Sequence, residues 1–380
     1  MVKDGYIRRA ESDGAYTEKT SLSPRQQGII AASHFLFWQA SQLPKNHPSQ
    51  IRTTIDRPLQ QFIEAQVRQV VHNLAVNNAH HAAALVVDNH SGEVLAYVGS
   101  PDYFSLSDMG RNDGVQALRQ PGSTLKPFLY QLALEKGIIR PNTVIADVPT
   151  HYAIDGAKLY SPKDYSDFQG AVRVRVALAN SLNIPAVKVL EKVGIPAFLN
   201  RLHQLGFNQL KHPPGYYGLG LTLGSGEVSL WELTRAYVTM ARHGQAIPLV
   251  TTFANAAPPE VSAASPTWGL VTDILSDSYA RALAFGVDSV LSLPLPAAVK
   301  TGTSSDFRDT WTVGFTTDYT VATWVGNFNG EPMKKVSGVM GAAPLWNRIM
   351  LHLHENKEPG AFAPPVGLVK QNVLFVRFRG

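Results

Sequence analysis

The sequence contains no cysteine, and this absence excludes several kinds of site. Disulfide bridges, thiolate-bound metals and cysteine nucleophiles are ruled out. Because a chain without cysteine suits both oxidising and reducing compartments, the absence does not indicate a location. The motifs Gly-x-Ser-x-Gly, His-Glu-x-x-His and Gly-x-Gly-x-x-Gly are also missing, so an α/β-hydrolase, a zinc peptidase and a Rossmann dehydrogenase have no support.

Long apolar runs are missing as well. The longest, Ile29 to Trp38, holds about ten residues with His34 inside it, against the roughly 20 needed to cross a bilayer. Basic residues are scattered despite a net charge of +5, so we expect no nucleic-acid partner. Neighbouring histidines stand at 80 and 81, but adjacent strand residues face opposite sides and no ligand spacing follows. We therefore expect solvated histidines, no metal and no cofactor.

The first feature that carries chemistry is a serine followed by a lysine, Ser123 and Lys126. Apolar residues after the serine repeat at helical spacing, which predicts an amphipathic helix that ends near Gly137. A proline fits only in the first turn of a helix, so Pro127 places the first helical residue between Ser123 and Lys126. The lysine amine then lies one turn from the hydroxyl, and a buried lysine can act as its base.

Two further motifs follow in the chain, Ser181-x-Asn183 and Lys300-Thr-Gly302. Each of the three motifs occurs once, and their order resembles the penicillin-binding proteins and serine β-lactamases. Their flanks, Arg-Gln-Pro-Gly-Ser-Thr-Leu-Lys-Pro-Phe-Leu-Tyr, Asn-Ser-Leu-Asn-Ile-Pro-Ala-Val and Lys-Thr-Gly-Thr-Ser, look like the transpeptidase domain of class A penicillin-binding proteins. The phrases Ala-Asp-Val-Pro and Phe-Arg-Asp-Thr-Trp point to the penicillin-binding protein 1C type. The resemblance covers roughly residues 51 to 350.

The resemblance implies an α/β (α+β) fold of the penicillin-binding protein and serine β-lactamase kind, with a five-stranded antiparallel sheet covered by helices and an all-helical lobe. We expect a transpeptidase domain over 51–355, a linker remnant over 1–50 and a C-terminal linker over 356–380 that holds the possible start of a further domain. Members of the family carry an N-terminal membrane anchor and a glycosyltransferase domain. Neither is visible, so the chain looks like an excised part of a longer protein.

The residue pattern alone predicts most elements of such a fold. We expect helices at Ser23–Gln42, 57–74, Val172–Ala179, Pro185–Val193, Pro196–Leu205, 230–244, Trp268–Ala284 and around Leu345–Leu353. Strands are expected at Ile51–Ile55, Ala82–Val87, Val94–Val98, Ala297–Thr303, Thr310–Phe315, Val321–Phe328 and Asn372–Arg379. Residues 141–170 and 254–266 read as irregular loops, of which the first shapes the mouth of a site.

The resemblance also assigns roles to the motif residues. Ser123 would attack the penultimate D-alanine of a peptidoglycan stem peptide and form an acyl-enzyme. Lys126 would be the base, with a pKa lowered by burial and by the nearby cation of Lys300, and Ser181 would relay a proton. The substrate-binding set comprises the Asn183 amide, the hydroxyls of Thr301 and Thr303, the N–H groups of Ser123 and Thr303 as the oxyanion hole, and Gly302, which would let a substrate strand approach.

Three interpretations of this site remain open: a D,D-transpeptidase acylated by β-lactams, a D,D-carboxypeptidase, and a non-catalytic module that binds peptidoglycan or a partner protein. A class A β-lactamase would need a glutamate with asparagine four residues later, and no glutamate here has one. Ser-x-Asn in place of Ser-x-Val also argues against a class D enzyme. The expected partners are stem peptides, β-lactams and other cell-wall synthesis proteins, at the periplasmic face of the inner membrane.

Overall fold

A five-stranded antiparallel sheet forms the centre of the computed structural model, which describes residues 31–152, 167–253, 265–365 and a few isolated positions. The strands lie in the order β2-β1-β7-β6-β5. Their bounds are β1 His81–Asp88, β2 Val94–Val98, β5 Ala298–Thr303, β6 Asp309–Phe315 and β7 Tyr319–Gly326. The first two strands form a hairpin, and β1 then pairs with β7, so that β5 is left at one edge.

Two helices cover one face of this sheet, α3 (Arg57–Leu74) and α12 (Ala342–Leu353). The Asp56 side chain caps α3 by accepting a hydrogen bond from the backbone N–H of Leu59 at 2.9 Å, as the sequence predicts. The expected apolar stripe of α3 packs with residues of α12 and the sheet in one hydrophobic cluster. This layer supports the sheet from the side away from the motif serines.

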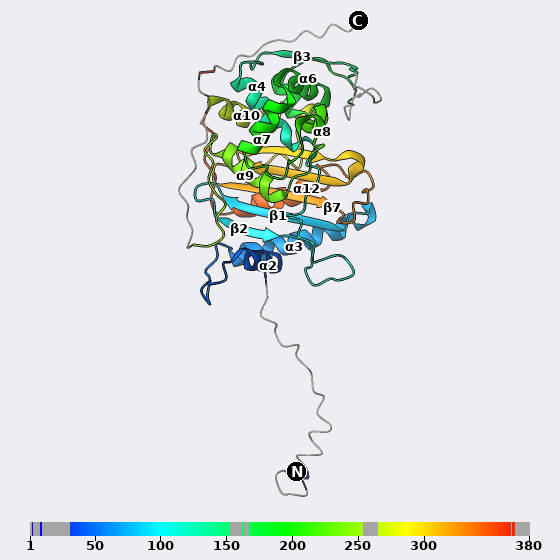
Figure 1. The fold of residues 1–380 in the computed structure, drawn as a ribbon. Helices are drawn as coiled ribbons and strands as arrows, with labels where there is room; N and C mark the ends of the chain where they lie inside the picture. Colours follow the sequence, from blue (N-terminus) through cyan, green and yellow to red (C-terminus); the bar gives the residue numbers. More distant parts are fainter. Residues whose placement is uncertain are drawn as a thin grey trace.

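The opposite face carries α9 (Leu230–Ala241) and a helical lobe (Figure 1). The lobe contains α4 Lys126–Glu135, α5 Val174–Ala179, α6 Asn183–Val193, α7 Ile195–Gln204, α8 Pro214–Tyr217 and α10 Pro266–Ser276. A capping box begins α9, since Ser229 and Glu232 bond each other's backbone N–H groups. The family fold expected from the sequence is therefore confirmed.

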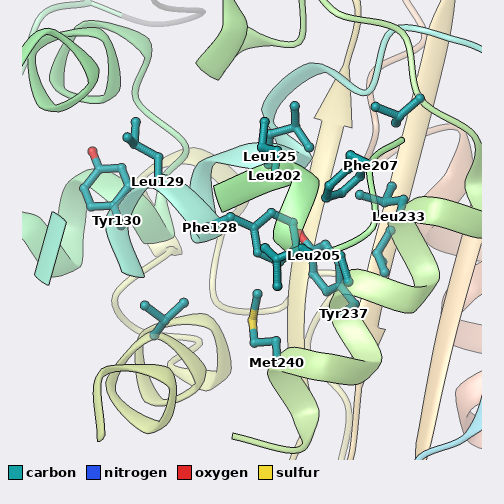
Figure 2. Packing of buried hydrophobic residues seen from close by; sticks show 14 of the residues in the cluster. Leu125, Phe128, Leu129, Tyr130, Leu202, Leu205, Phe207, Leu233, Tyr237 and Met240 are labelled. Atoms are coloured by element: carbon teal, nitrogen blue, oxygen red, sulfur yellow. The ribbon is translucent and has the colours of Figure 1, made fainter. Parts of the chain in front are cut away.

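Helix α4 lies in the interior of the lobe, which differs from the amphipathic helix that its spacing predicts. Every residue from Lys126 to Leu134 is buried, because α6, α7 and α10 surround it. Its Phe128 ring meets Phe207 and Tyr237 edge to face, at 5.8 and 5.2 Å between centroids (Figure 2). The Tyr237 hydroxyl donates to the carbonyl of Thr124 at 2.8 Å. This packing holds the residues that follow Ser123 in place.

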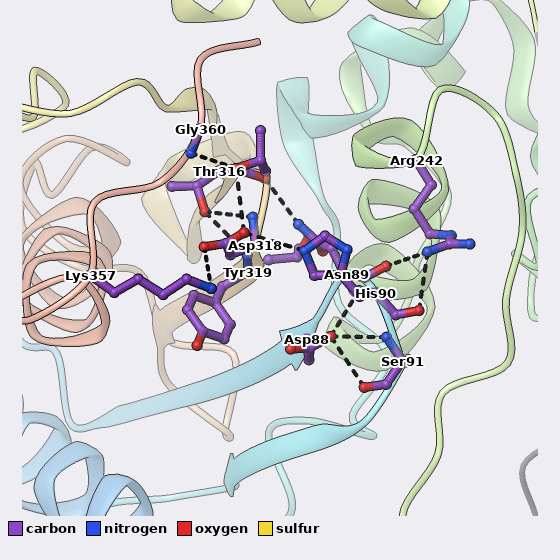
Figure 3. Close-up of polar contacts among 12 residues, drawn as sticks. Asp88, Asn89, His90, Ser91, Arg242, Thr316, Asp318, Tyr319, Lys357 and Gly360 are labelled. Atoms are coloured by element: carbon purple, nitrogen blue, oxygen red, sulfur yellow. Dashed lines mark hydrogen bonds and ion pairs between the residues drawn. The ribbon is translucent and has the colours of Figure 1, made fainter. Parts of the chain in front are cut away.

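The segment after α12 returns to the turn between β6 and β7 (Figure 3). Lys357 Nζ lies 2.9 Å from Asp318 Oδ2, and His90 Nε2 lies 3.3 Å from the other carboxylate oxygen. Burial alone would raise the pKa of Asp318, but the two basic side chains lower it. The Phe362 ring packs edge to face on Phe315 at 5.8 Å. Residues 357–362 thus belong to the body of the fold.

Several local predictions were wrong. Ile51–Ile55 forms only an isolated bridge, Thr53 to Thr252, because no strand lies beside it for more than one residue. The predicted helix from 268 to 284 is two helices, α10 and the short α11 (Ala282–Phe285), since the Asp277 side chain caps the backbone N–H of Ala280. A second sheet pairs β3 (Val144–Asp147), inside the segment read as irregular, with β4 (Gly170–Arg173), which begins at the end of that segment and replaces the start of the predicted helix 172–179.

Other predictions are confirmed in part or lie outside the described residues. The first helix is seen as α2 (Ser33–Gln42). The strand at 372–379 and most of the loop at 254–266 fall outside the described residues. His81 is wrongly predicted as solvated: it is 3% exposed in β1, where its Nε2 lies 2.7 Å from the carbonyl of Asp108.

Candidate active site

Ser123 lies in a 3₁₀ turn, η2 (Gly122–Leu125), that leads directly into α4. Pro127 occupies the first turn of α4, as the sequence predicts. Gly122 has a φ of 57°, and a Cβ atom there would come within 2.5 Å of the carbonyl oxygen of Thr303 and 2.7 Å of its nitrogen. The glycine therefore allows the turn that carries Ser123 to lie against strand β5.

Lys126 is fully buried, and its ammonium group is aimed at the Ser-x-Asn turn. Its Nζ donates to the carbonyl of Ser181 at 2.6 Å, to the carbonyl of Leu182 at 3.2 Å and to Asn183 Oδ1 at 2.6 Å. A buried amine needs such acceptors, because burial without hydrogen bonds is costly. These contacts bring the first and second motifs together.

Ser181 links the second motif to the third. Its backbone has a φ of 60°, which is uncommon outside glycine and holds the turn between α5 and α6. Its Oγ accepts a hydrogen bond from Lys300 Nζ at 2.8 Å, and that amine also donates to the carbonyl of Thr301 at 2.8 Å. Ser181 thus lies between the two lysines, contacting one through its carbonyl and the other through its hydroxyl.

Strand β5 carries the third motif at the edge of the sheet. Thr303 Oγ1 accepts a hydrogen bond from the N–H of Gly338 at 3.0 Å. The position where Gly302 lacks a side chain is filled by the Pro121 carbonyl and the Thr124 methyl group. This differs from the expected approach of substrate: here the glycine makes room for the turn that carries the nucleophile.

These residues surround one cavity of about 410 Å³. Four hydroxyl-bearing residues of the three motifs line it, namely Ser123, Ser181, Thr301 and Thr303. Ser123 is 8% exposed, so its side chain is shielded yet reaches the cavity. The remaining lining residues are Asn180, Leu182, Leu283, Ala284, Phe285, Ser337, Gly338, Val339 and Met340.

Sequence reasoning missed most of that second group. Leu283 and Phe285 lie in what reads as the end of a longer helix, and Val339 and Met340 lie in an unremarkable link before α12. No local pattern marks them, because their contact with the cavity depends on the packing of distant segments. The sequence did offer a signal for Asn180, since it stands next to the Ser-x-Asn motif.

The surroundings of Lys300 shift the pKa of its side chain. Burial and the neighbouring Lys126 cation lower the pKa of Lys300 well below the usual value for a lysine. A neutral amine bonded to the Ser181 hydroxyl is able to accept a proton from it. The expected lowering of the Lys126 pKa by Lys300 stays a prediction.

The lowered pKa of Lys300 predicts a pH-dependent stability. Between that pKa and about 10.4, the unfolded chain binds a proton that the folded protein does not, so the free energy of unfolding rises with pH. Replacing Lys300 by methionine removes this contribution. We expect the difference in free energy of unfolding between the unsubstituted protein and Lys300→Met to increase from about pH 7 to about pH 10 in urea titrations. Parallel pH profiles would contradict the shift.

No group of three or more His, Asp or Glu side chains among the described residues is placed to hold a metal ion. No helix in the described part of the chain is long and apolar enough to span a membrane.

Comparison with known proteins extends the resemblance seen in the motifs. The model of the penicillin binding protein transpeptidase domain matches residues 82–351. Penicillin-binding protein 1C of Escherichia coli (strain K12) is 32% identical over 350 residues, which make up 92% of this chain and 44% of that protein. The chain spans less than half the length of the curated relatives it matches.

Solved structures give the same fold. Penicillin-binding protein 1A from Haemophilus influenzae has a TM-score of 0.78 at 17% identity, covering 98% of this chain and 77% of that one. The PonA1 protein from Mycobacterium tuberculosis, in complex with penicillin V, has a TM-score of 0.67 at 23% identity, covering 84% and 89%. At these identities the two structures show only that the fold is shared. Membership of the family rests on the sequence, through the match to the family model and the similarity to penicillin-binding protein 1C. The chain belongs to the family of penicillin-binding protein transpeptidase domains.

Proposed function

We propose that this chain is a serine D,D-transpeptidase that cross-links peptidoglycan stem peptides through an acyl-enzyme and is acylated by β-lactams. One observation carries the proposal: Ser123, Ser181, Thr301 and Thr303 line one cavity, and Lys126 and Lys300 both bond to Ser181. A serine one helical turn from a buried amine, with a second buried amine bonded to a neighbouring hydroxyl, has the adjacent bases that activated-serine acyl transfer needs. The PonA1 complex with penicillin V shows that a protein of the same fold binds a β-lactam.

In the proposed first step, the Ser123 oxygen forms a bond to the carbonyl carbon of the penultimate D-alanine. The C–N bond to the terminal D-alanine then breaks, and its nitrogen leaves with a proton. The Thr303 N–H lies beside the turn of Gly122, so it and the Ser123 N–H can receive the developing oxyanion. Attack by an acceptor amine on the ester then forms the cross-link and restores the serine hydroxyl.

Protons would pass through the bonded set of lysines and Ser181. Lys126 would take the Ser123 proton in its neutral form, with the single positive charge of the pair on Lys300. Ser181 would pass a proton toward the leaving nitrogen, since its hydroxyl is bonded to Lys300. Asn183 accepts from Lys126 through Oδ1, so it would bind the substrate backbone through its N–H₂ group. Edge strand β5 would pair with the substrate as an added strand, and the Thr301 and Thr303 hydroxyls would bind its terminal carboxylate.

The same proposal sets the context of the chain. Residues 51–355 would form the transpeptidase domain, on which residues 357–362 also pack. We propose that it acts outside the cytoplasm, at the periplasmic face of the inner membrane. Its partners would be stem peptides, β-lactams and other cell-wall synthesis proteins.

A product assay separates this activity from its alternatives. A pentapeptide that ends in D-alanyl-D-alanine is incubated with the protein, with and without an acceptor amine. The products are identified by mass spectrometry. A transpeptidase forms the amide adduct with the acceptor and releases D-alanine. Hydrolysis alone, unaffected by the amine, would identify a D,D-carboxypeptidase. Binding of the peptide without release of D-alanine would identify a non-catalytic module.

A further inference from the structure

Five apolar residues line the same cavity as the motif hydroxyls. They are Leu283, Ala284 and Phe285 from one segment and Val339 and Met340 from another, here called the apolar wall. Leu283 is 71% exposed and Met340 is 54% exposed. Exposed apolar side chains gathered at the mouth of a polar site mark a surface that an apolar group can cover.

The flank that holds Leu283 is short and needs outside support. Its helix α11 contains only four residues, which is too few to be stable alone. Arg281 is buried and donates to the carbonyls of Leu275 and Leu291, at 2.7 and 3.3 Å. These bonds tie the segment to the chain before and after it, but they do not connect it to the nucleophile side of the cavity.

Asn180 makes that connection. It is 5% exposed and directly precedes Ser181. Its Nδ2 donates to the carbonyl of Ala280 at 2.6 Å, and its Oδ1 accepts from the N–H of Ala284 at 2.9 Å. Only a side chain with both a donor and an acceptor can bond the two ends of this turn at once. The residue beside the Ser-x-Asn turn therefore sets where Leu283 stands.

We infer that Asn180 is a positioning residue, which holds the Leu283–Phe285 part of the apolar wall in the cavity of Ser123 so that it receives an aliphatic or aromatic side group of the acyl donor. The inference rests on the proposed acylation of Ser123. It makes Leu283 a specificity-determining residue: burial of its side chain against the donor favours acyl donors with an apolar group over those without one. Loss of the wall, or of its anchor, lowers that preference.

The test compares two penicillins that share a ring nucleus. Benzylpenicillin carries an aromatic acyl group, and 6-aminopenicillanic acid carries none. The ratio of their second-order acylation rates, followed by mass spectrometry of the intact protein, is the readout. We expect this ratio to fall roughly tenfold in Leu283→Ser and in Asn180→Ala, which is the scale of selectivity that one apolar contact provides. A merely structural role of Asn180 would slow both reactions and leave the ratio unchanged.

Two further variants sharpen the test. Asn180→Asp is nearly isosteric, keeps the acceptor for Ala284 and loses the donor to Ala280, so its ratio should fall between those of the unsubstituted protein and Asn180→Ala. Asn347→Ala is the matched control. Its Nδ2 donates to the carbonyl of Val290 at 2.8 Å and so anchors the next loop, away from the cavity. Its ratio should stay that of the unsubstituted protein.

The outcomes separate the two claims. Equal acylation by both penicillins, or an unchanged ratio in Leu283→Ser, would overturn the apolar subsite while leaving the acyl-enzyme intact. A lowered ratio in Leu283→Ser with an unchanged ratio in Asn180→Ala and Asn180→Asp would overturn the positioning role. Absence of acylation by both compounds in the unsubstituted protein would overturn the proposed function and this inference with it.

Discussion

Replacement of Ser123 by alanine is expected to abolish covalent labelling by a fluorescent penicillin. The proposed acyl bond forms on the Ser123 oxygen. The other hydroxyl of η2, that of Thr124, is fully buried and bonded to the carbonyl of Pro121, so it cannot carry the adduct instead. The loss should be at least about 10³-fold, because serine acyl-transfer enzymes lose activity on this scale when the nucleophile is removed. Gel fluorescence, followed by mass mapping of the labelled peptide, measures it.

A control for this experiment lies in the same cavity. Ser337 also lines it but belongs to none of the three motifs, so Ser337→Ala should keep labelling within about threefold, in line with a side chain outside the reacting groups. A matching melting temperature would show that Ser123→Ala is folded. Label that survives in Ser123→Ala would end the proposal that this serine is the nucleophile.

Replacement of Lys126 by methionine is expected to lower acylation by about 10²- to 10⁴-fold, the range that general-base catalysis contributes. The methionine side chain is nearly as long as that of lysine, but it lacks the amine that bonds Ser181, Leu182 and Asn183. Those acceptors lose this hydrogen-bond donor. The free energy of unfolding then falls by about 1–3 kcal/mol for each buried acceptor that stays unsatisfied. Stopped-flow acylation and urea unfolding measure the two effects separately.

Lys188→Met is the matched control for Lys126. Its Nζ also donates to a backbone carbonyl of the lobe, that of Ala146 at 2.8 Å, but at an exposed position outside the cavity. Acylation should remain within about twofold in this variant, since a surface lysine contributes little. If the Lys126→Met variant is stable and is acylated at the normal rate, another group accepts the serine proton.

Much of the fold can be predicted from the sequence, because the local patterns in the sequence agree with the packing of the folded protein. The Asp56 cap and the Ser229 capping box are local hydrogen-bonding patterns, and both begin helices where expected. The three final strands follow from short links between apolar runs. The failures are at Ile51–Ile55, where a strand needs a partner that only tertiary structure supplies, and at α4, whose neighbours bury the face that reads as polar.

The sequence by itself determined the chemistry that this protein carries: its nucleophile candidate, its two lysines and their order are readable because each sits in a unique local motif. Only the tertiary structure decided how these parts meet. It places Lys126 on the Ser181 turn, holds Gly122 against Thr303, and bonds Ala284, next to Leu283, to Asn180. These contacts join segments separated by tens to hundreds of residues, so no window of sequence contains them, and it is burial that shifts the pKa of Lys300.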